Sequence, residues 1–429
     1  MTENTAQVTP GPVNFRATLA HRDFRLVWSG QAISSVGTFM FPFVIAVLIL
    51  RRGGGATGLG LVLAVQTITI VLGTLATAAL GDRFRRTRIM ITADVLRCLA
   101  VTALAVTPAK TPVDLFAIPV AVMGFGEGLF QPSFSASIPR LLPEHLLQPG
   151  NGLNAASLYL STVFGPALAG VVVGAWGTGS ALAIDAATFV VSIGTLLAIR
   201  ESAVSVRQAA PGSDGRGWLR QTADDLRGGI RAVRARPWIG FMIAMSTGIM
   251  TFGTAPALVL LPVVATTRLG GPHTYAITLV VMGAGAVLGS LVGGRIQTKR
   301  PGVVAMCGAA TDALALIGLA FFPALGVYIC WGIAGFGVTV CQILWLTALQ
   351  RDVPEDVMTR VMALDWLGSQ ALMPIGYALT GPIARVVGTR TLLLSGVALI
   401  CVFTPLPLLA RGGTTFSTPK CVPEPDRVG

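Results

Sequence analysis

The feature that most limits the fold of this chain is a series of apolar stretches, each long enough to cross a lipid bilayer. An α-helix needs roughly 20 predominantly apolar residues to span the hydrocarbon core. Hydrophobic residues make up 53% of the 429 residues, which is more apolar surface than a soluble domain of this length can bury. We therefore predict twelve spans, at 25–50, 57–80, 89–107, 113–137, 152–176, 180–199, 239–265, 273–294, 302–322, 325–349, 361–385 and 391–410.

The abundance of glycine favours a bundle of helices over a β-barrel. The chain has 51 glycines, and small residues let helices approach closely in lipid, where packing drives their association. Strands of a membrane barrel would instead appear as short segments of alternating hydrophobicity. The predicted fold class is therefore an all-α membrane protein.

The basic residues indicate how the bundle is oriented. If the N-terminus is cytoplasmic, 24 of the 31 Lys and Arg fall in cytoplasmic segments and six in outside loops. This bias predicts a multi-pass protein of the cytoplasmic (inner) membrane with both termini inside. The net charge of +12 is then explained by topology and by anionic headgroups, so we expect the lipid bilayer and not nucleic acid as a partner.

The spans fall into two groups of six, separated by a long polar stretch. In that stretch Leu219, Leu226, Ile230 and Val233 share one helical face, which predicts an amphipathic helix on the membrane surface. The predicted organisation is a tail at 1–24, a six-helix bundle at 25–199, a linker at 200–238, a second bundle at 239–410 and a tail at 411–429. Both tails are expected to be cytoplasmic.

Related motifs recur in the two groups of spans. Residues 124–126 (Gly-Phe-Gly) recur as 335–337, and the basic loop at 81–88 is echoed at 293–300. Residues 140–144 recur in part as 351–355, and Gly165 recurs as Gly376. Four matches that keep register over about a hundred residues indicate an internal duplication. Two related six-helix halves are typical of transporters whose substrate site lies at the repeat interface.

Several stretches resemble one family. These stretches lie at 21–31 (HRDFRLVWSGQ), 82–97 (DRFRRTRIMITADVLR), 183–189 (AIDAATF) and 224–237 (DDLRGGIRAVRARP). Together they are similar to the secretion-effector branch of the major facilitator superfamily, which includes enterobactin-exporter-like and macrolide-efflux-like pumps. The resemblance implies two pseudo-symmetric six-helix halves that alternately expose a central site.

The resemblance also implies a conformational latch at the loop between the second and third spans. Asp82 would hold the halves together when the cytoplasmic side is closed, with Arg83, Arg86 and Arg88 beside it and Asp365 as a plausible partner. The second copy of the loop has Gly294 in place of the acid, so the latch is expected in one half. The alternative is a solvated basic loop with no gating role.

Five of the charged residues inside predicted spans are candidates for proton coupling, because charged groups within a membrane are functional candidates. Asp94 and Arg97 share a helix face at i, i+3 and would form either a structural ion pair or part of the coupling machinery. Glu127 lies in the middle of the fourth span without a basic neighbour, which suits proton coupling or recognition of a cationic substrate. The alternative is a hydrogen-bonded packing role. Asp185 and Asp312 are further candidates, although a structural role that satisfies neighbouring groups is favoured for both because the sixth and ninth helices of such a fold are peripheral.

The resemblance places a substrate cavity between the first, fourth, seventh and tenth helices. Gly165, Pro166 and Gly170 of the fifth span resemble the Gly-Pro motif of antiporters, which supports export. Cavity candidates are large or polar side chains that suit a bulky, partly hydrophobic substrate: Phe39, Phe43, Met123, Gln131, Met250, Phe252, Gln342 and Trp345.

The function expected from these features is export of a drug-like, siderophore-like or other natural-product-like small molecule by proton antiport. No catalytic triad or phosphate-binding loop is present, so the chain is not expected to be an enzyme or to bind a cofactor or metal. We expect a monomer. An importer or uniporter of the same fold, or a membrane sensor that does not transport, remain alternatives.

Overall fold

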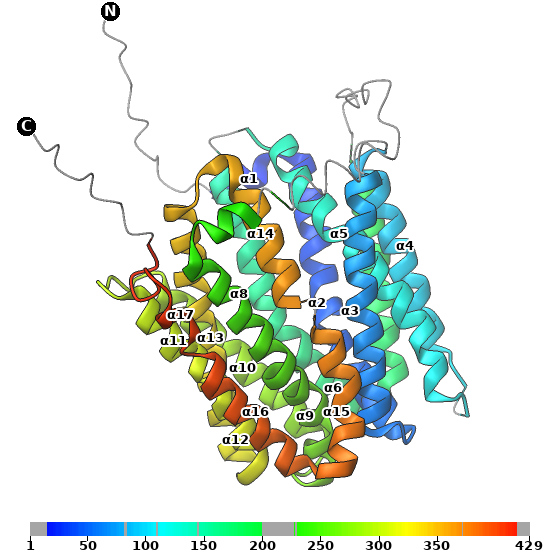
Figure 1. The fold of residues 1–429 in the computed structure, drawn as a ribbon. Coiled ribbons are helices and arrows are strands. Elements are labelled where there is room, and N and C mark those ends of the chain that lie inside the picture. The colour runs from blue at the N-terminus through cyan, green and yellow to red at the C-terminus, as the bar shows by residue number, and fades with distance from the viewer. Residues whose placement is uncertain are drawn as a thin grey trace, which may run out of the picture.

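The structure is a computed structural model that describes residues 15–80, 84–108, 110–143, 146–199, 227, 230–370 and 372–417. All the regular elements in these ranges are helices, and Figure 1 shows them running side by side as one bundle. We call the end of the bundle where α2 begins, at Arg22, the proximal face. The opposite end, where α2 finishes at Arg51, is the distal face.

The N-terminal half contains six spans. Its fifth and sixth spans form one long element in which Gly177 has φ 85°, a left-handed conformation that glycine adopts easily and that reverses the chain direction. The helices of this half are α1 (Phe15–Ala20), α2 (Arg22–Arg51), α3 (Gly55–Leu80), α4 (Arg86–Ala105), η1 (Val113–Phe116), α5 (Ala117–Leu141) and α6 (Leu147–Leu197).

The C-terminal half differs because several of its spans consist of more than one helical element. Proline occupies the first turn of α8, α10 and α11, where its missing N–H costs nothing. The seventh span contains a π-helical turn, η3, between α8 and α9. The elements are α8 (Pro237–Ile249), η3 (Met250–Thr254), α9 (Ala255–Thr267), α10 (Pro272–Gly293), α11 (Pro301–Ala310), α12 (Asp312–Phe321), α13 (Ala324–Asp352), α14 (Glu355–Gln370), α15 (Met373–Val387), α16 (Thr389–Phe403) and α17 (Leu406–Leu409).

Nine helices in the described part of the chain are long and apolar enough to cross a membrane. The predicted twelve spans are consistent with this number. The element α6 contains two spans, α4 carries four charged residues, and the eleventh span is divided between α14 and α15. The predicted all-helical membrane fold is therefore confirmed. The predicted amphipathic linker helix falls mostly outside the described residues. Of its residues that are described, Arg227 and 230–234 are helical.

The two halves meet mainly through α3 against α15 and α6 against α10. Figure 1 shows α3 and α15 side by side towards the distal face. A Cβ atom at Gly60 of α3 would lie 2.1 Å from the backbone oxygen of Tyr377 of α15, so these backbones are in direct contact. Nearby, Arg385 donates a hydrogen bond to Thr57 at 2.8 Å. This contact closes the distal face between the halves.

Substituting Gly60 with Ala is expected to push α3 and α15 apart, because the added methyl group meets a backbone oxygen that cannot move aside. Spin labels at Leu61 and Ile383, which are exposed on these two helices, should report a longer distance than in the parent protein. The matched control is Gly194→Ala in α6, where an added Cβ meets no atom within 4 Å. Equal distances in the parent and Gly60→Ala would contradict the contact.

Candidate functional site: the central cavity

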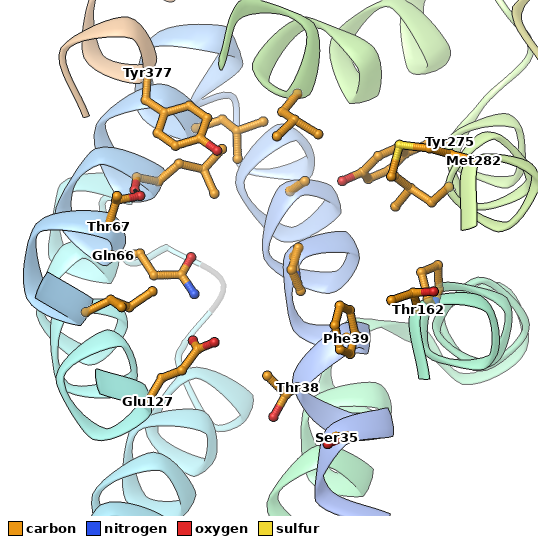
Figure 2. A pocket seen from close by; sticks show the side chains of 18 of the residues that line it. Ser35, Thr38, Phe39, Gln66, Thr67, Glu127, Thr162, Tyr275, Met282 and Tyr377 are labelled. Atoms are coloured by element: carbon orange, nitrogen blue, oxygen red, sulfur yellow. Dashed lines mark hydrogen bonds between the residues drawn. The ribbon is translucent and has the colours of Figure 1, made fainter. Parts of the chain in front are cut away.

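A cavity of about 610 Å³ lies between the two halves, within the size range of small-molecule sites. Its walls come from α2, α3, α5 and α6 of the first half and from α9, α10 and α15 of the second (Figure 2). The lining residues are Ser35, Thr38, Phe39, Pro42, Ala46, Leu59, Leu63, Gln66, Thr67, Ile70, Glu127, Gln131, Leu158, Thr162, Pro166, Leu258, Tyr275, Leu279, Met282 and Tyr377.

The cavity wall is largely apolar and carries one acidic side chain. Glu127 is that acid, and no Lys, Arg or His is among the lining residues. Hydroxyl and amide groups provide the remaining polarity. Figure 2 shows the hydroxyl groups of Tyr275 and Tyr377 pointing into the cavity from the second half. Such a wall suits a ligand with a large apolar surface, a few hydrogen-bonding groups and a positive charge.

Glu127 extends from α5 into this space. Figure 2 shows its carboxylate pointing into the cavity, near the side chains of Gln66 on α3 and Thr38 on α2. The adjacent Gly128 packs against α3 so closely that a Cβ there would lie 2.2 Å from the backbone oxygen of Ile70. This close packing holds α5 against α3 and fixes the position from which Glu127 reaches the ligand space.

Behind Glu127, Asp94 and Arg97 form the ion pair predicted from their spacing, and both are buried. The second carboxylate oxygen of Asp94 accepts a hydrogen bond from Ser192 of α6 at 2.6 Å. The Arg97 guanidinium lies between the rings of Phe130 and Phe189, at 4.4 Å and 4.6 Å from their centroids. Both oxygens of Asp94 are thus engaged, and the cation is enclosed by aromatic faces.

Asp185 of α6 is in a different situation. It is buried against Gly37 of α2, and neither of its carboxylate oxygens has a hydrogen-bond partner within the described residues. Arg97 is the basic group whose charge acts on both Asp185 and Glu127. Three acids of the first half, Asp94, Asp185 and Glu127, therefore share one nearby cation. Arg97 forms an ion pair with Asp94 and not with the other two.

Asp312 is remote from these groups, in the second half. It begins α12 and accepts a hydrogen bond from Thr254 of the π-helical turn at 3.0 Å. It is not among the lining residues of the cavity. The four predicted intramembrane acids are thus divided between a cluster beside the cavity and a separate position on helices α12 and η3.

The predicted cavity residues occupy several environments. Phe39 and Gln131 line the cavity, and Phe43 stacks on Tyr275 with ring centroids 5.0 Å apart. The remaining candidates lie away from this cavity: Met123 is buried in the core, Met250 packs beside Ala255 and Met373, Phe252 stacks on Phe403, Gln342 is exposed, and Trp345 packs on Trp238 and Phe416.

Some lining residues were not predicted. Gln66, Thr67, Tyr275, Met282 and Tyr377 come from α3, α10 and α15, whereas the prediction drew on the first, fourth, seventh and tenth helices. The sequence signal that could have identified them is the presence of isolated polar or aromatic residues in the second, eighth and eleventh spans. In an apolar span, such residues are more easily explained by facing a cavity than by facing lipid.

The Gly-Pro motif of α6 lies where the halves and the cavity meet. Gly165 packs against Phe39 of α2, Pro166 lines the cavity, and Gly170 packs against Ala276 of α10. The motif therefore contacts helices of both halves. Its role in antiport remains a prediction.

The predicted latch residues are only partly within the described chain. Asp82 and Arg83 lie outside it. Arg86 donates a hydrogen bond to the backbone oxygen of Ala136, and Arg88 is exposed. Asp365 of α14 accepts a hydrogen bond from the indole of Trp345 at 3.1 Å. The interaction between Asp82 and the second half thus stays a prediction.

Comparison with known proteins identifies relatives along most of the chain. Macrolide efflux protein A of Streptococcus pyogenes is 23% identical over 398 residues, covering 90% of this chain and 95% of the relative. The enterobactin exporter EntS of Citrobacter koseri is 24% identical over 424 residues, covering 96% and 97%. Both relatives match at full length, although the identity is low.

The fold is similar to solved transporter structures. A POT family transporter in complex with a thioalcohol-conjugated peptide matches with a TM-score of 0.71 at 15% identity, covering 90% of this chain and 95% of that one. A POT family transporter in complex with 5-aminolevulinic acid matches equally well, with a TM-score of 0.71 at 14% identity, covering 92% and 97%. The family model for the Major Facilitator Superfamily matches residues 27–377. The chain therefore belongs to the major facilitator superfamily, as a secondary transporter and not an enzyme.

Proposed function

We propose that this transporter exports a lipophilic, positively charged small molecule in exchange for protons. The observation that carries the proposal is the position of Glu127, the one acid on a cavity wall that has no basic side chain. A carboxylate in an apolar site is strongly favoured to have a neutralising partner. Within the cavity, a proton or a cationic substrate can fill that role.

Competition for one carboxylate provides the exchange. When the substrate cation binds Glu127 it displaces the proton, and when a proton returns it releases the substrate. Each ligand therefore favours dissociation of the other, which is the requirement for antiport across a membrane. Gln66, Thr67, Tyr275 and Tyr377 supply hydrogen-bonding groups that orient the substrate.

The direction of transport is proposed from the relatives and from the charge distribution. Both relatives described above are named as efflux or export proteins. The excess of basic residues at the proximal face supports placing that face in the cytoplasm. The closed contact between α3 and α15 at the distal face then corresponds to a state that takes up substrate from the cell interior. Asp82 is proposed to latch the opposite state, in which the proximal face is closed.

A matched pair of probes tests the charge preference of the cavity. Tetraphenylphosphonium and tetraphenylborate have nearly the same size and shape but opposite charges. We expect the cation to bind the purified protein and the anion to bind at least about tenfold more weakly, because a charge-assisted contact contributes about 1.5–3 kcal/mol. Binding is measured by equilibrium dialysis, with protein-free detergent micelles as the blank.

Glu127→Gln should remove the difference between the two probes, and Gln131→Ala, which changes an uncharged residue on the same wall, should preserve it. Equal binding of the two ions by the parent protein, tighter binding of the anion, or no specific binding of the cation would each contradict a cation-selective cavity.

A further inference from the structure

Asp312 is an intramembrane acid of the second half that the mechanism at the cavity does not use. It follows the ten residues of α11 and the residue Thr311, which at about 1.5 Å per residue places it near the middle of the ninth span. It is half-buried, and within the described residues Thr254 is its one hydrogen-bond partner. An ionised acid at this depth without a cation beside it destabilises the protein, and intramembrane acids are therefore treated as functional candidates.

The partner of Asp312 belongs to an unusual turn of helix. Residues 250–254 form a π-helical turn, closed by a hydrogen bond from the Ala255 N–H to the Met250 carbonyl. Single π-helical turns are uncommon and occur frequently at functional sites. Thr254 can direct its hydroxyl either to Asp312 or back to the Met250 carbonyl four residues earlier, a common bond for threonine in helices. The turn thus has two alternative hydrogen-bonding patterns.

The same turn contacts the helix that closes the distal face. The backbone oxygen of Thr251 would lie 2.4 Å from a Cβ atom at Gly376 of α15, so η3 and α15 are in backbone contact. The next residue of α15, Tyr377, lines the cavity, and its backbone oxygen contacts Gly60 of α3. On the other side, α9 continues from η3 and places Leu258 on the cavity wall. A change at Asp312 can therefore reach both the cavity and the contact between halves through packed elements.

Among the described residues, no charged group forms a hydrogen bond or an ion pair with Asp312. Its neighbours include Gly253, where a Cβ would lie 3.5 Å from Asp312 Oδ2, and Ile400 of α16 packs on that same glycine. Within the described part of the chain, Asp312 forms no hydrogen bond or ion pair with the ionisable side chains of the helices packed around α12. These side chains are Cys307 of α11, Tyr328, Cys330, Cys341, Arg351 and Asp352 of α13, and Arg390 and Cys401 of α16.

We propose that Asp312 and Thr254 form a second proton-binding site, in the C-terminal half, whose occupancy sets the conformation of the π-helical turn. This inference rests on the proposed proton-driven export and adds a second proton to each transport cycle. With Asp312 ionised, Thr254 donates to it and the π-helical turn is held. With Asp312 protonated, this acceptor is lost in part, Thr254 turns back to Met250, and the turn can rewind and shift α9 relative to α15.

The second proton makes a prediction about charge movement. Exchange of one proton for one monovalent cation moves no net charge, whereas exchange of two protons moves one. We therefore expect ethidium transport in proteoliposomes, driven by a pH gradient, to accelerate severalfold when a membrane potential favours proton movement, since the potential acts on each net charge moved. In Asp312→Asn the acceleration by the potential should be lost, while transport driven by the pH gradient remains.

Two further variants separate a proton site from a structural role. Thr254→Val removes the hydroxyl and should reduce the effect of the potential, and Thr254→Ser, which keeps the hydroxyl, should restore it. If the role of Asp312 were purely structural, Asp312→Asn would reduce transport driven by the pH gradient and transport driven by the membrane potential to the same extent. Wild-type transport that responds to the pH gradient but not to the potential would overturn the second site alone. Wild-type protein without ethidium transport driven by a pH gradient would instead contradict the proposed function.

Discussion

Replacement of Glu127 by Gln is expected to abolish proton-driven transport while the folded protein persists. The amide has nearly the shape of the carboxyl group but neither carries a charge nor exchanges a proton. Losing a charge-assisted contact to a cation costs about 1.5–3 kcal/mol, which corresponds to roughly 10–150-fold weaker binding. Proton-driven exchange should be lost even if Asp312 still binds its proton, because Glu127 is the one acid among the lining residues of the cavity, where proton and substrate compete.

The variant is checked by ethidium uptake into proteoliposomes with an acidic lumen, together with the thermal unfolding temperature in detergent. Gln131→Ala serves as the control on the same helix, where it removes a polar but uncharged contact. It should weaken transport without uncoupling it. Proton-driven uptake that persists in Glu127→Gln at more than a small fraction of the parent rate would rule out Glu127 as the coupling residue.

Replacement of Arg97 by Met is expected to destabilise the N-terminal half strongly. Arg97 and Asp94 form a buried ion pair, and removing one partner of such a pair typically costs about 3–5 kcal/mol because the other charge is left uncompensated. Here the penalty is extended by Asp185, which is also buried and on which the charge of Arg97 acts. Methionine keeps much of the apolar stem but removes the guanidinium that lies between Phe130 and Phe189. The loss therefore reports mainly on the charged group, including its contacts with the two rings.

Thermal unfolding in detergent measures this effect, and two comparisons sharpen it. Arg22→Met removes an exposed cation that pairs with Asp23 at 3.3 Å and donates a hydrogen bond to the Ala198 carbonyl, and it should cost about 1 kcal/mol. The double variant Asp94→Asn/Arg97→Met should recover part of the stability that Arg97→Met loses. If Arg97→Met unfolds at the same temperature as Arg22→Met, the ion pair does not have the structural role assigned to it.

The spans and the main acid of the cavity could be predicted because both depend on local sequence. An apolar stretch of membrane length must form a helix, because its backbone groups cannot bond to water within lipid. A glutamate in the middle of such a helix is expected to face the interior of the bundle or a cavity instead of lipid. The i, i+3 spacing of Asp94 and Arg97 likewise determines that they meet on one helix face. These features need no knowledge of how the helices pack.

Features that depend on packing between distant helices could not be predicted. Asp94 and Asp185 look alike in sequence, yet Asp94 is engaged by Ser192, 98 positions away, while Asp185 has no hydrogen-bond partner among the described residues. The cavity wall includes Tyr275 and Tyr377 because α10 and α15 meet the first half, an arrangement that helix periodicity does not reveal. The π-helical turn at 250–254 likewise has no signature in the sequence.

The most direct test of the proposed antiport follows proton movement while substrate is transported. Proteoliposomes with an acidic lumen carry a pH-sensitive dye inside, and ethidium is added outside. If Glu127 exchanges protons for a cation, ethidium should enter while the lumen becomes alkaline, and Glu127→Gln should show neither change. Ethidium entry without alkalinisation, or alkalinisation that is the same in the parent protein and in Glu127→Gln, would contradict proton–cation exchange at this carboxylate.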